Sequence, residues 1–134
     1  MNIETGKSKI FINLFCSATL VAAVFLLYSK NLSGFWRADD PQILLQALKY
    51  SWWEYFFIPD VWQTLSVANL TPWVTFSFDL DLHLFGINPF GFYLHHLASF
   101  GAVAVATFFL FSLWVEKHWA YLGALLFLVG SPVE

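Results

Sequence analysis

Two long runs of apolar residues constrain this chain more than any other feature. Residues 10–28 contain no charged side chain, and residues 89–115 carry no formal charge, although they include His95 and His96. A helix of about 20 apolar residues crosses the roughly 30 Å hydrocarbon core of a bilayer. We therefore expect an all-α integral membrane protein with two full transmembrane helices, at residues 10–28 and 89–115.

A third apolar run begins near Trp119 and is cut off where the sequence ends at Glu134. This pattern predicts a partial third helix at 119–134 and favours a fragment of a longer protein. The first run could instead be a signal peptide. It is longer than the usual 7–15 apolar residues of such a peptide, and no small-x-small cleavage site follows it, so an uncleaved anchor is favoured.

The composition fits lipid better than water as the surroundings of the chain. Apolar residues make up 59% of the sequence and charged residues only 11%, whereas about 25% of residues are charged in soluble domains. The net charge of -3 includes no basic patch, which argues against a nucleic-acid partner. The single cysteine, Cys16, is expected to be an apolar filler of the first helix.

Lysine placement predicts the orientation. Lys7 and Lys9 precede the first run, and Lys117 follows the second, so all three lie on one side if both runs cross the membrane. The positive-inside rule makes that side cytoplasmic and places the N-terminus there. Lys30 and Arg37 would then lie on the opposite side, which weakens the assignment.

The loop at residues 29–88 is therefore expected outside, and its composition predicts a folded segment at the membrane surface. It is rich in tryptophan, with Trp36, Trp52, Trp53, Trp62 and Trp73. Disordered linkers lack so many aromatic rings. The Asp40-Pro41 pair predicts a helix start, and apolar residues at helical spacing extend this amphipathic, interfacial helix to about Phe57.

A second helix is expected to begin at Thr71-Pro72. Residues 76–84 alternate between apolar and polar, which is the period of a strand. A lone strand beside a bilayer leaves its backbone unpaired, so a helix is favoured. Residues 86–89 (GINP) predict the turn into the second apolar run.

Two groups of ionisable residues in the loop could carry chemistry. Asp39 and Asp40 could supply a general base or help to hold a divalent cation, and Arg37 could pair with a carboxylate or a phosphate. The simpler interpretation is a helix cap. Asp79, Asp81 and His83 would form a metal-binding edge if extended, but they are ordinary interface residues if helical.

His95 is expected to point into the helix bundle, because it shares a helical face with small residues. An ionisable residue at this depth either binds a substrate or bonds to another helix.

The order of several short segments resembles the start of GT-C glycosyltransferases, which include the protein O-mannosyltransferases and related bacterial membrane proteins. These segments are FWRADDP at 35–41, TPW at 71–73, LFGINPFGF at 84–92, LHHL at 94–97 and SPVE at 131–134. The resemblance implies transfer of sugar from a polyprenyl-phosphate carrier to a hydroxyl acceptor, outside a bacterial inner membrane. It gives Asp39 the role of the base and Asp40 that of its acidic neighbour. From the residue arguments above, Arg37 and His95 are the candidate substrate-binding residues.

The resemblance leaves the cofactor unknown, since some members use a divalent metal and others do not. GT-C enzymes have many more helices, so 134 residues alone are not expected to be active. Two alternatives remain open. One is a small non-enzymatic subunit that binds a partner protein, other membrane helices or lipid through its aromatic loop. The other is a transporter fragment in which His95 or His96 carries protons.

Overall fold

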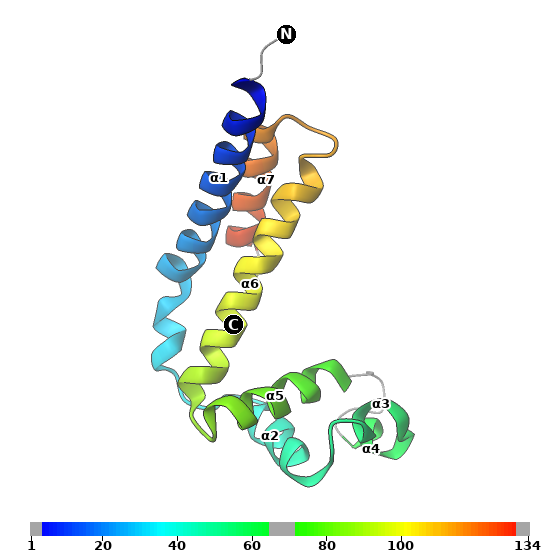
Figure 1. Ribbon diagram of the computed structural model, residues 1–134. Coiled ribbons are helices and arrows are strands. Elements are labelled where there is room, and N and C mark those ends of the chain that lie inside the picture. The colour runs from blue at the N-terminus through cyan, green and yellow to red at the C-terminus, as the bar shows by residue number, and fades with distance from the viewer. Residues whose placement is uncertain (1–3, 65–71, 131–134) are drawn as a thin grey trace. The chain divides into compact units, whose positions relative to one another are not determined.

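The computed structural model describes residues 4–64 and 72–130, and every regular element within these ranges is a helix (Figure 1). The chain forms two compact units. The three-helix unit comprises residues 1–30 and 96–134, and the loop unit comprises residues 31–95. Each unit is described by itself below.

The apolar runs form the helices of the three-helix unit, with bounds slightly different from those expected. Helix α1 spans Glu4–Tyr28, α6 spans Pro89–Phe111 and α7 spans Lys117–Gly130. Helix α6 contributes its first turns to the loop unit and the rest to this unit. The runs at Ser8–Ser33 and Pro89–Phe111 are long and apolar enough to cross a membrane. Residues 131–134 lie outside the described residues.

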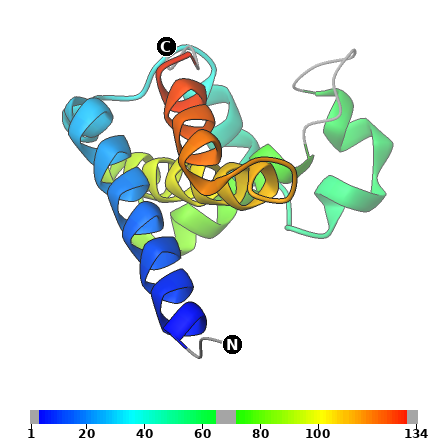
Figure 2. The same cartoon turned by 90° about the horizontal axis from the view of Figure 1, so that it is seen from above.

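The second long helix ends at Phe111, whereas the apolar run predicted an end at residue 115. The amide of Leu113 donates to the carbonyl of Leu110, and that of Trp114 donates to the carbonyl of Phe111. These bonds span three residues rather than four and tighten the chain into a turn. The short link that follows, orange in Figure 2, leads directly into α7.

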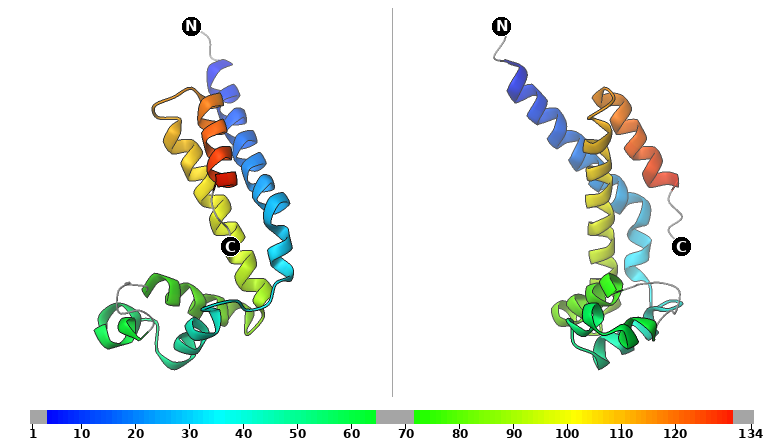
Figure 3. Two further views of the ribbon diagram at one scale, coloured as in Figure 1. Left: turned by 180° about the vertical axis from the view of Figure 1, so that it is seen from behind. Right: turned by 90° about the vertical axis from the view of Figure 1, so that its right-hand side faces the viewer.

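Helices α1 and α7 lie side by side and run in the same direction (Figure 3). Three polar contacts join the two helices, and these contacts follow one another in the same order along α1 and along α7. The contacts pair Asn13 with Lys117, Thr19 with Tyr121, and Tyr28 with the carbonyl of Leu128. Because hydrogen bonds inside an apolar bundle fix the register of neighbouring helices, this ladder sets how α1 and α7 align.

A small residue lets α1 and α6 approach each other closely. A Cβ atom at Gly101 would lie 3.6 Å from a methyl carbon of Val21. Leu20, Val24 and Ala104 are completely buried. Small residues at a helix contact permit such an approach between backbones.

In the loop unit, helix α2 (Asp40–Lys49) packs against α5 (Pro72–Phe85). The buried core consists of Leu44, Ala47, Phe78 and Phe92, with Trp36, Ile43 and Leu82 packed against it. Phe92 contacts the rings of Trp36 and Phe78 edge to face, with ring centroids 4.9 and 5.3 Å apart. Full burial of a Phe side chain contributes roughly 1.5–3 kcal/mol. This core fixes residues 36–47 against α5 and the start of α6.

The prediction of one helix from Asp40 to Phe57 is wrong, because α2 ends at Lys49. The chain restarts as two short helices, α3 (Glu54–Phe57) and α4 (Pro59–Gln63). Glu54 Oε2 accepts from the Ser51 amide at 2.6 Å, and the Glu54 amide donates to the Ser51 carbonyl at 2.9 Å. The Ser-x-x-Glu spacing of a capping box, which such contacts define, marks a helix start in the sequence. The hydroxyl of Tyr55 then donates to the Tyr50 carbonyl at 2.8 Å.

The prediction of a helix over the alternating residues 76–84 is confirmed, because α5 spans Pro72–Phe85. Helix α5 begins at Pro72; Thr71 lies outside the described residues. Gly86 follows α5 with φ of +61°, a left-handed conformation that glycine adopts without steric cost. Asn88 Oδ1 then accepts from the Phe90 amide at 3.2 Å, so Asn88 caps α6.

Candidate functional site

A short turn before α2 brings the backbone amide of Arg37 and the hydroxyl of Tyr93 close to the Asp40 carboxylate. The backbone amide of Arg37 donates to Asp40 Oδ2 at 3.0 Å. The hydroxyl of Tyr93, on α6, lies 3.3 Å from the same oxygen and donates to the Phe35 carbonyl at 2.7 Å. Tyr93 thus joins the start of α6 to both ends of this turn, and Asp40 is half-buried within it.

Asp39 differs from its neighbour in exposure and in contacts. Its side chain is exposed and makes no capping bond to α2, whereas its carbonyl accepts from the amides of Gln42 and Ile43 at 3.0 Å each. The cap interpretation is therefore wrong for the Asp39 side chain. The residue before it, Ala38, has φ of +41°. Left-handed conformations cost a non-glycine residue about 1–3 kcal/mol and cluster at functional turns.

Arg37 contacts Asp40 through its backbone rather than through the side-chain pairing that the sequence suggested. The hydrogen bond runs from the Arg37 backbone amide to Asp40 Oδ2. Its guanidinium lies toward Gly34, where an added Cβ would meet Nη2 at 3.6 Å. Arg37 is exposed, so its charge remains accessible for an anionic ligand.

A second cluster joins α5 to α6 inside the loop unit. Nδ1 of His95 lies 2.7 Å from Oδ1 of Asp81. The Asp81 side chain is 1% exposed and that of His95 is 32% exposed. A carboxylate beside Nδ1 favours a proton on that nitrogen and orients the ring. The prediction that His95 points inward is refined: its partner is a buried carboxylate of the loop unit.

The idea of a metal-binding edge at residues 79–83 is wrong, because this segment is helical. His83 Nδ1 lies 3.3 Å from Asp79 Oδ1, one helical turn away, while Asp81 faces His95 instead. Within residues 4–64 and 72–130, no group of three His, Cys, Asp or Glu side chains could hold a metal ion. Asp79 is buried near the phenol of Tyr55.

Tyr55 is the most perturbed ionisable group of the loop unit. Its side chain is 1% exposed. Burial raises the pKa of the Tyr55 hydroxyl well above its usual value near 10, and the carboxylates of Asp79 and Glu54 raise that pKa further. Tyr55 is therefore a neutral hydrogen-bond donor that ties α3 to the end of α2.

The structure thus brings together some of the expected residues and adds one that sequence reasoning missed. Arg37 and Asp40 share a turn, and His95 pairs with Asp81, but Asp39 joins neither contact. Tyr93 was missed because a tyrosine at the start of an apolar run is typical of any membrane interface. Its spacing of 53 residues from Asp40 gives no local signal.

Comparisons with protein families, with characterised proteins and with solved structures find no match for this chain. What defines the class of this protein is its fold. Over the residues described the chain is all-helical, and two of its helices are long and apolar enough to cross a membrane.

Proposed function

We propose that α1 and α6 cross a lipid bilayer. The support is that each is long and apolar enough, and that the rest of the described chain leaves both largely uncovered. On α1, Ile10, Leu14 and Leu26 are 62%, 65% and 82% exposed. The core helix of a soluble protein is mostly covered by its own chain, whereas hydrocarbon covers a membrane helix.

We place the N-terminus in the cytoplasm and residues 29–88 outside. The Lys117 ammonium lies 3.5 Å from the Lys9 carbonyl, so the start of α1 and the start of α7 lie at one end of the three-helix unit. Lysines gathered at one end of a membrane unit mark its cytoplasmic side.

The topology is tested by labelling a single cysteine at position 39 in intact cells. Cys16→Ser supplies a background without native thiols, and Asp39→Cys adds the probe site. A maleimide that does not cross membranes should label position 39 from outside. A matched Lys9→Cys variant should react only after the cells are opened. Reversal of the two results would invert the topology and remove the carboxylates from the outer face.

On this topology, the chain acts as the N-terminal part of a GT-C-type glycosyltransferase. The observation that carries the proposal is the unequal engagement of two adjacent carboxylates. Asp40 is held by the Arg37 amide and by Tyr93, while Asp39 is exposed at the edge of a strained turn. One carboxylate is therefore structural, and the other is accessible to a substrate.

In the proposed reaction, Asp39 accepts the proton of an acceptor hydroxyl while that oxygen attacks the anomeric carbon of the sugar. The bond from this carbon to the lipid phosphate breaks, and the phosphate leaves with the electron pair. Arg37 supplies a positive charge for the phosphate, and the Asp81–His95 pair presents an oriented imidazole to the substrate.

The reaction is tested in membranes that contain the full-length protein. Asp39→Asn should lower sugar transfer from a polyprenyl-phosphate donor by about 10²–10⁴-fold, the usual effect of losing a general base. Asp60→Asn, which changes another exposed carboxylate of the loop unit, should leave transfer intact. Unchanged transfer in Asp39→Asn at equal protein levels would rule out its role as the base.

The exposed tryptophans of the loop unit favour a second candidate, a non-enzymatic subunit that binds a partner or lipid. Trp52, Trp53 and Trp73 are 58%, 45% and 71% exposed. Aromatic residues are enriched in binding surfaces and at membrane interfaces. If this candidate holds, Trp52→Ala with Trp53→Ala should disrupt assembly, while Asp39→Asn should have little effect.

A further inference from the structure

A patch of aromatic residues lies where α3 contacts the start of α5, within the loop unit. The ring centroids of Phe56 and Trp73 lie 4.9 Å apart, and the centroid of Phe76 lies 5.8 Å from that of Phe56 and 6.1 Å from that of Trp73. Trp53 and Phe57 flank Phe56 on one helical turn, in which the Phe57 amide donates to the Trp53 carbonyl at 3.2 Å. These five residues are called the aromatic patch below.

Much of the aromatic patch is uncovered. Phe57 is 74% exposed and Trp73 is 71% exposed, and Trp53 is also exposed. The edge-to-face contacts with Phe56 and Phe76 support the indole of Trp73 from one side only. Large apolar rings that stay in water forgo the free energy of burial, and their clustering on a surface marks a place where another phase or molecule docks.

The length of α6 indicates that lipid covers the patch. With 23 residues, α6 is about 34 Å long, only slightly longer than the roughly 30 Å hydrocarbon core that we propose it crosses. Its fourth residue, Phe92, belongs to the buried core of the loop unit. The loop unit is therefore built around a turn of α6 that lies at the edge of the hydrocarbon, beside the lipid headgroups.

The charges around the patch indicate how it would bind lipid. Residues 51–64 and 72–85 contain no Lys or Arg, so nothing in these segments attracts anionic lipids. Tryptophan and phenylalanine rings enter the layer between headgroups and acyl chains through their apolar area, and the indole N–H keeps a polar partner there. An uncharged membrane surface is therefore sufficient for the patch.

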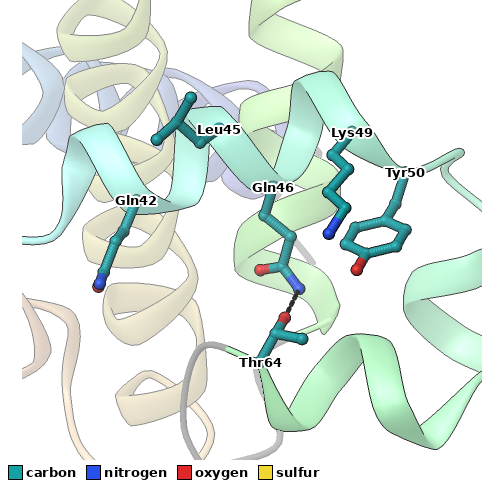
Figure 4. Close-up of a pocket in the computed structure, with 6 residues that line it drawn as sticks. All are labelled: Gln42, Leu45, Gln46, Lys49, Tyr50 and Thr64. Carbon is teal, nitrogen blue, oxygen red and sulfur yellow. Dashed lines mark hydrogen bonds between the residues drawn. The ribbon is translucent and has the colours of Figure 1, made fainter.

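Helix α2 presents a polar surface for comparison. Gln42, Gln46 and Lys49 follow at spacings of four and three residues and share one face of the helix. Figure 4 shows them along a hollow that Thr64 also lines. Gln46 is 6% exposed and its Nε2 donates to Thr64 Oγ1 at 2.8 Å, whereas Gln42 and Lys49 are exposed. Exposed amide and ammonium groups keep their hydration, so Gln42 marks a position in contact with water.

We propose that the aromatic patch inserts into the headgroup layer of the bilayer and holds the loop unit against the membrane surface. Trp53, Phe57 and Trp73 contact lipid, while Phe56 and Phe76 support Trp73 from within the unit. The apolar faces of interfacial elements are buried by about 5–10 Å in this layer. The inference rests on the proposed crossing of α6, and it does not depend on the glycosyltransferase reaction.

The insertion is tested by spin-label accessibility of the full chain in phosphatidylcholine vesicles. Cys16→Ser removes the native thiol. Phe57→Cys or Trp73→Cys then places one nitroxide in the patch, and Gln42→Cys places one on α2. The accessibility to oxygen, which concentrates in lipid, is divided by the accessibility to a water-soluble nickel chelate. We expect this ratio to be at least about threefold higher at positions 57 and 73 than at position 42, in keeping with insertion by about 5–10 Å.

A charge introduced into the patch should release it from lipid. Trp73→Asp should lower the ratio at position 57 to the value at position 42, because a carboxylate is costly to remove from water. Gln63→Asp adds the same charge at an exposed glutamine outside the patch and should leave the ratio unchanged. Trp73→Phe keeps an aromatic ring and should retain the high ratio. A high ratio retained in Trp73→Asp would contradict the proposal.

A label at Val103, which is 49% exposed and lies well inside α6, separates failure of the insertion from failure of the crossing. We expect it to report hydrocarbon. Equal ratios at positions 57, 73 and 42, with hydrocarbon at position 103, would overturn the insertion and leave the crossing intact. Water at position 103 would overturn both. Low accessibility to both reagents at positions 57 and 73 would show that protein covers the patch, which would also overturn the proposal.

Discussion

Asp81 on α5 and His95 on α6 form a close pair, with Oδ1 of the aspartate 2.7 Å from Nδ1 of the histidine. Both oxygens of the carboxylate are enclosed by protein. A carboxylate withdrawn from water is stable only beside a partner that compensates for its lost hydration. The pair therefore links α5 to α6 and also makes the stability of the loop unit depend on His95.

We predict that His95→Leu lowers the free energy of unfolding by about 3 kcal/mol, because it leaves the Asp81 carboxylate buried without this partner. The double variant Asp81→Leu/His95→Leu should regain at least about 1 kcal/mol, since the charge is then absent too. Denaturant unfolding in nanodiscs, followed by tryptophan fluorescence, measures both. His83→Leu removes an imidazole that is 76% exposed and should cost less than about 1 kcal/mol. A double variant no more stable than His95→Leu would show that Asp81 and His95 are not coupled.

The turn before α2 should loosen when the Tyr93 hydroxyl is removed. Tyr93→Phe eliminates the bond to the Phe35 carbonyl and the contact with Asp40. We expect a loss of about 0.5–1.5 kcal/mol and faster hydrogen exchange at the Asp40 amide. Tyr121→Phe deletes a comparable hydroxyl in the three-helix unit and should leave that exchange rate unchanged. Equal rates in Tyr93→Phe and the parent protein would contradict the anchoring role.

Alkaline pH should destabilise the loop unit through Tyr55. The pKa of this buried phenol is raised above its usual 10, so between pH 10 and the folded-state pKa the unfolded chain loses a proton that the folded chain keeps. The stabilising contribution is complete below pH 10 and falls as the pH rises beyond it. Tyr55→Phe should flatten the decline between about pH 10 and 11, although it costs about 1 kcal/mol at pH 7. The measurement is urea unfolding at several pH values. If the free energy of unfolding falls with pH equally in the parent protein and in Tyr55→Phe, Tyr55 is not the cause of the decline.

Gly91 is required by the approach of Phe85 to the first turn of α6. A Cβ at this position would lie 2.2 Å from Phe85 Cγ and 2.5 Å from Phe85 Cβ. Gly91→Ala should therefore cost about 1–3 kcal/mol, and Phe85→Gly in the same chain, which removes both of these atoms, should recover part of the loss. Thermal unfolding followed by circular dichroism compares them with Gly130→Ala, where an added Cβ meets nothing within 4 Å. A Gly91→Ala variant as stable as the parent would disprove the close contact.

The helices themselves could largely be predicted from the sequence. Proline marked the starts of α5 and α6, and Gly86 marked the end of α5, because each acts on the backbone locally. The end of α2 was missed although a local signal existed: Ser51 and Glu54 have the spacing of a capping box. Apolar residues beyond Lys49 obscured this signal, since they kept the helical period.

The candidate site was predictable only in its list of residues. Asp39, Asp40 and His95 stood out as ionisable groups near apolar runs. Which of the two aspartates is held, and by what, depends on Tyr93, which is distant in sequence. The same holds for Gln46, whose burial depends on α4 folding back toward α2.

The sequence by itself determined the two long apolar helices and the helical identity of the segment between them, because hydrophobic length, proline and glycine act over a few residues. Only the tertiary structure decided that His95 faces Asp81, that Asp40 rather than Asp39 is engaged, and that the amide of Gln46 is buried. These three features depend on contacts between side chains of different helices. The packing of Leu44, Phe78 and Phe92 into one core brings those helices together.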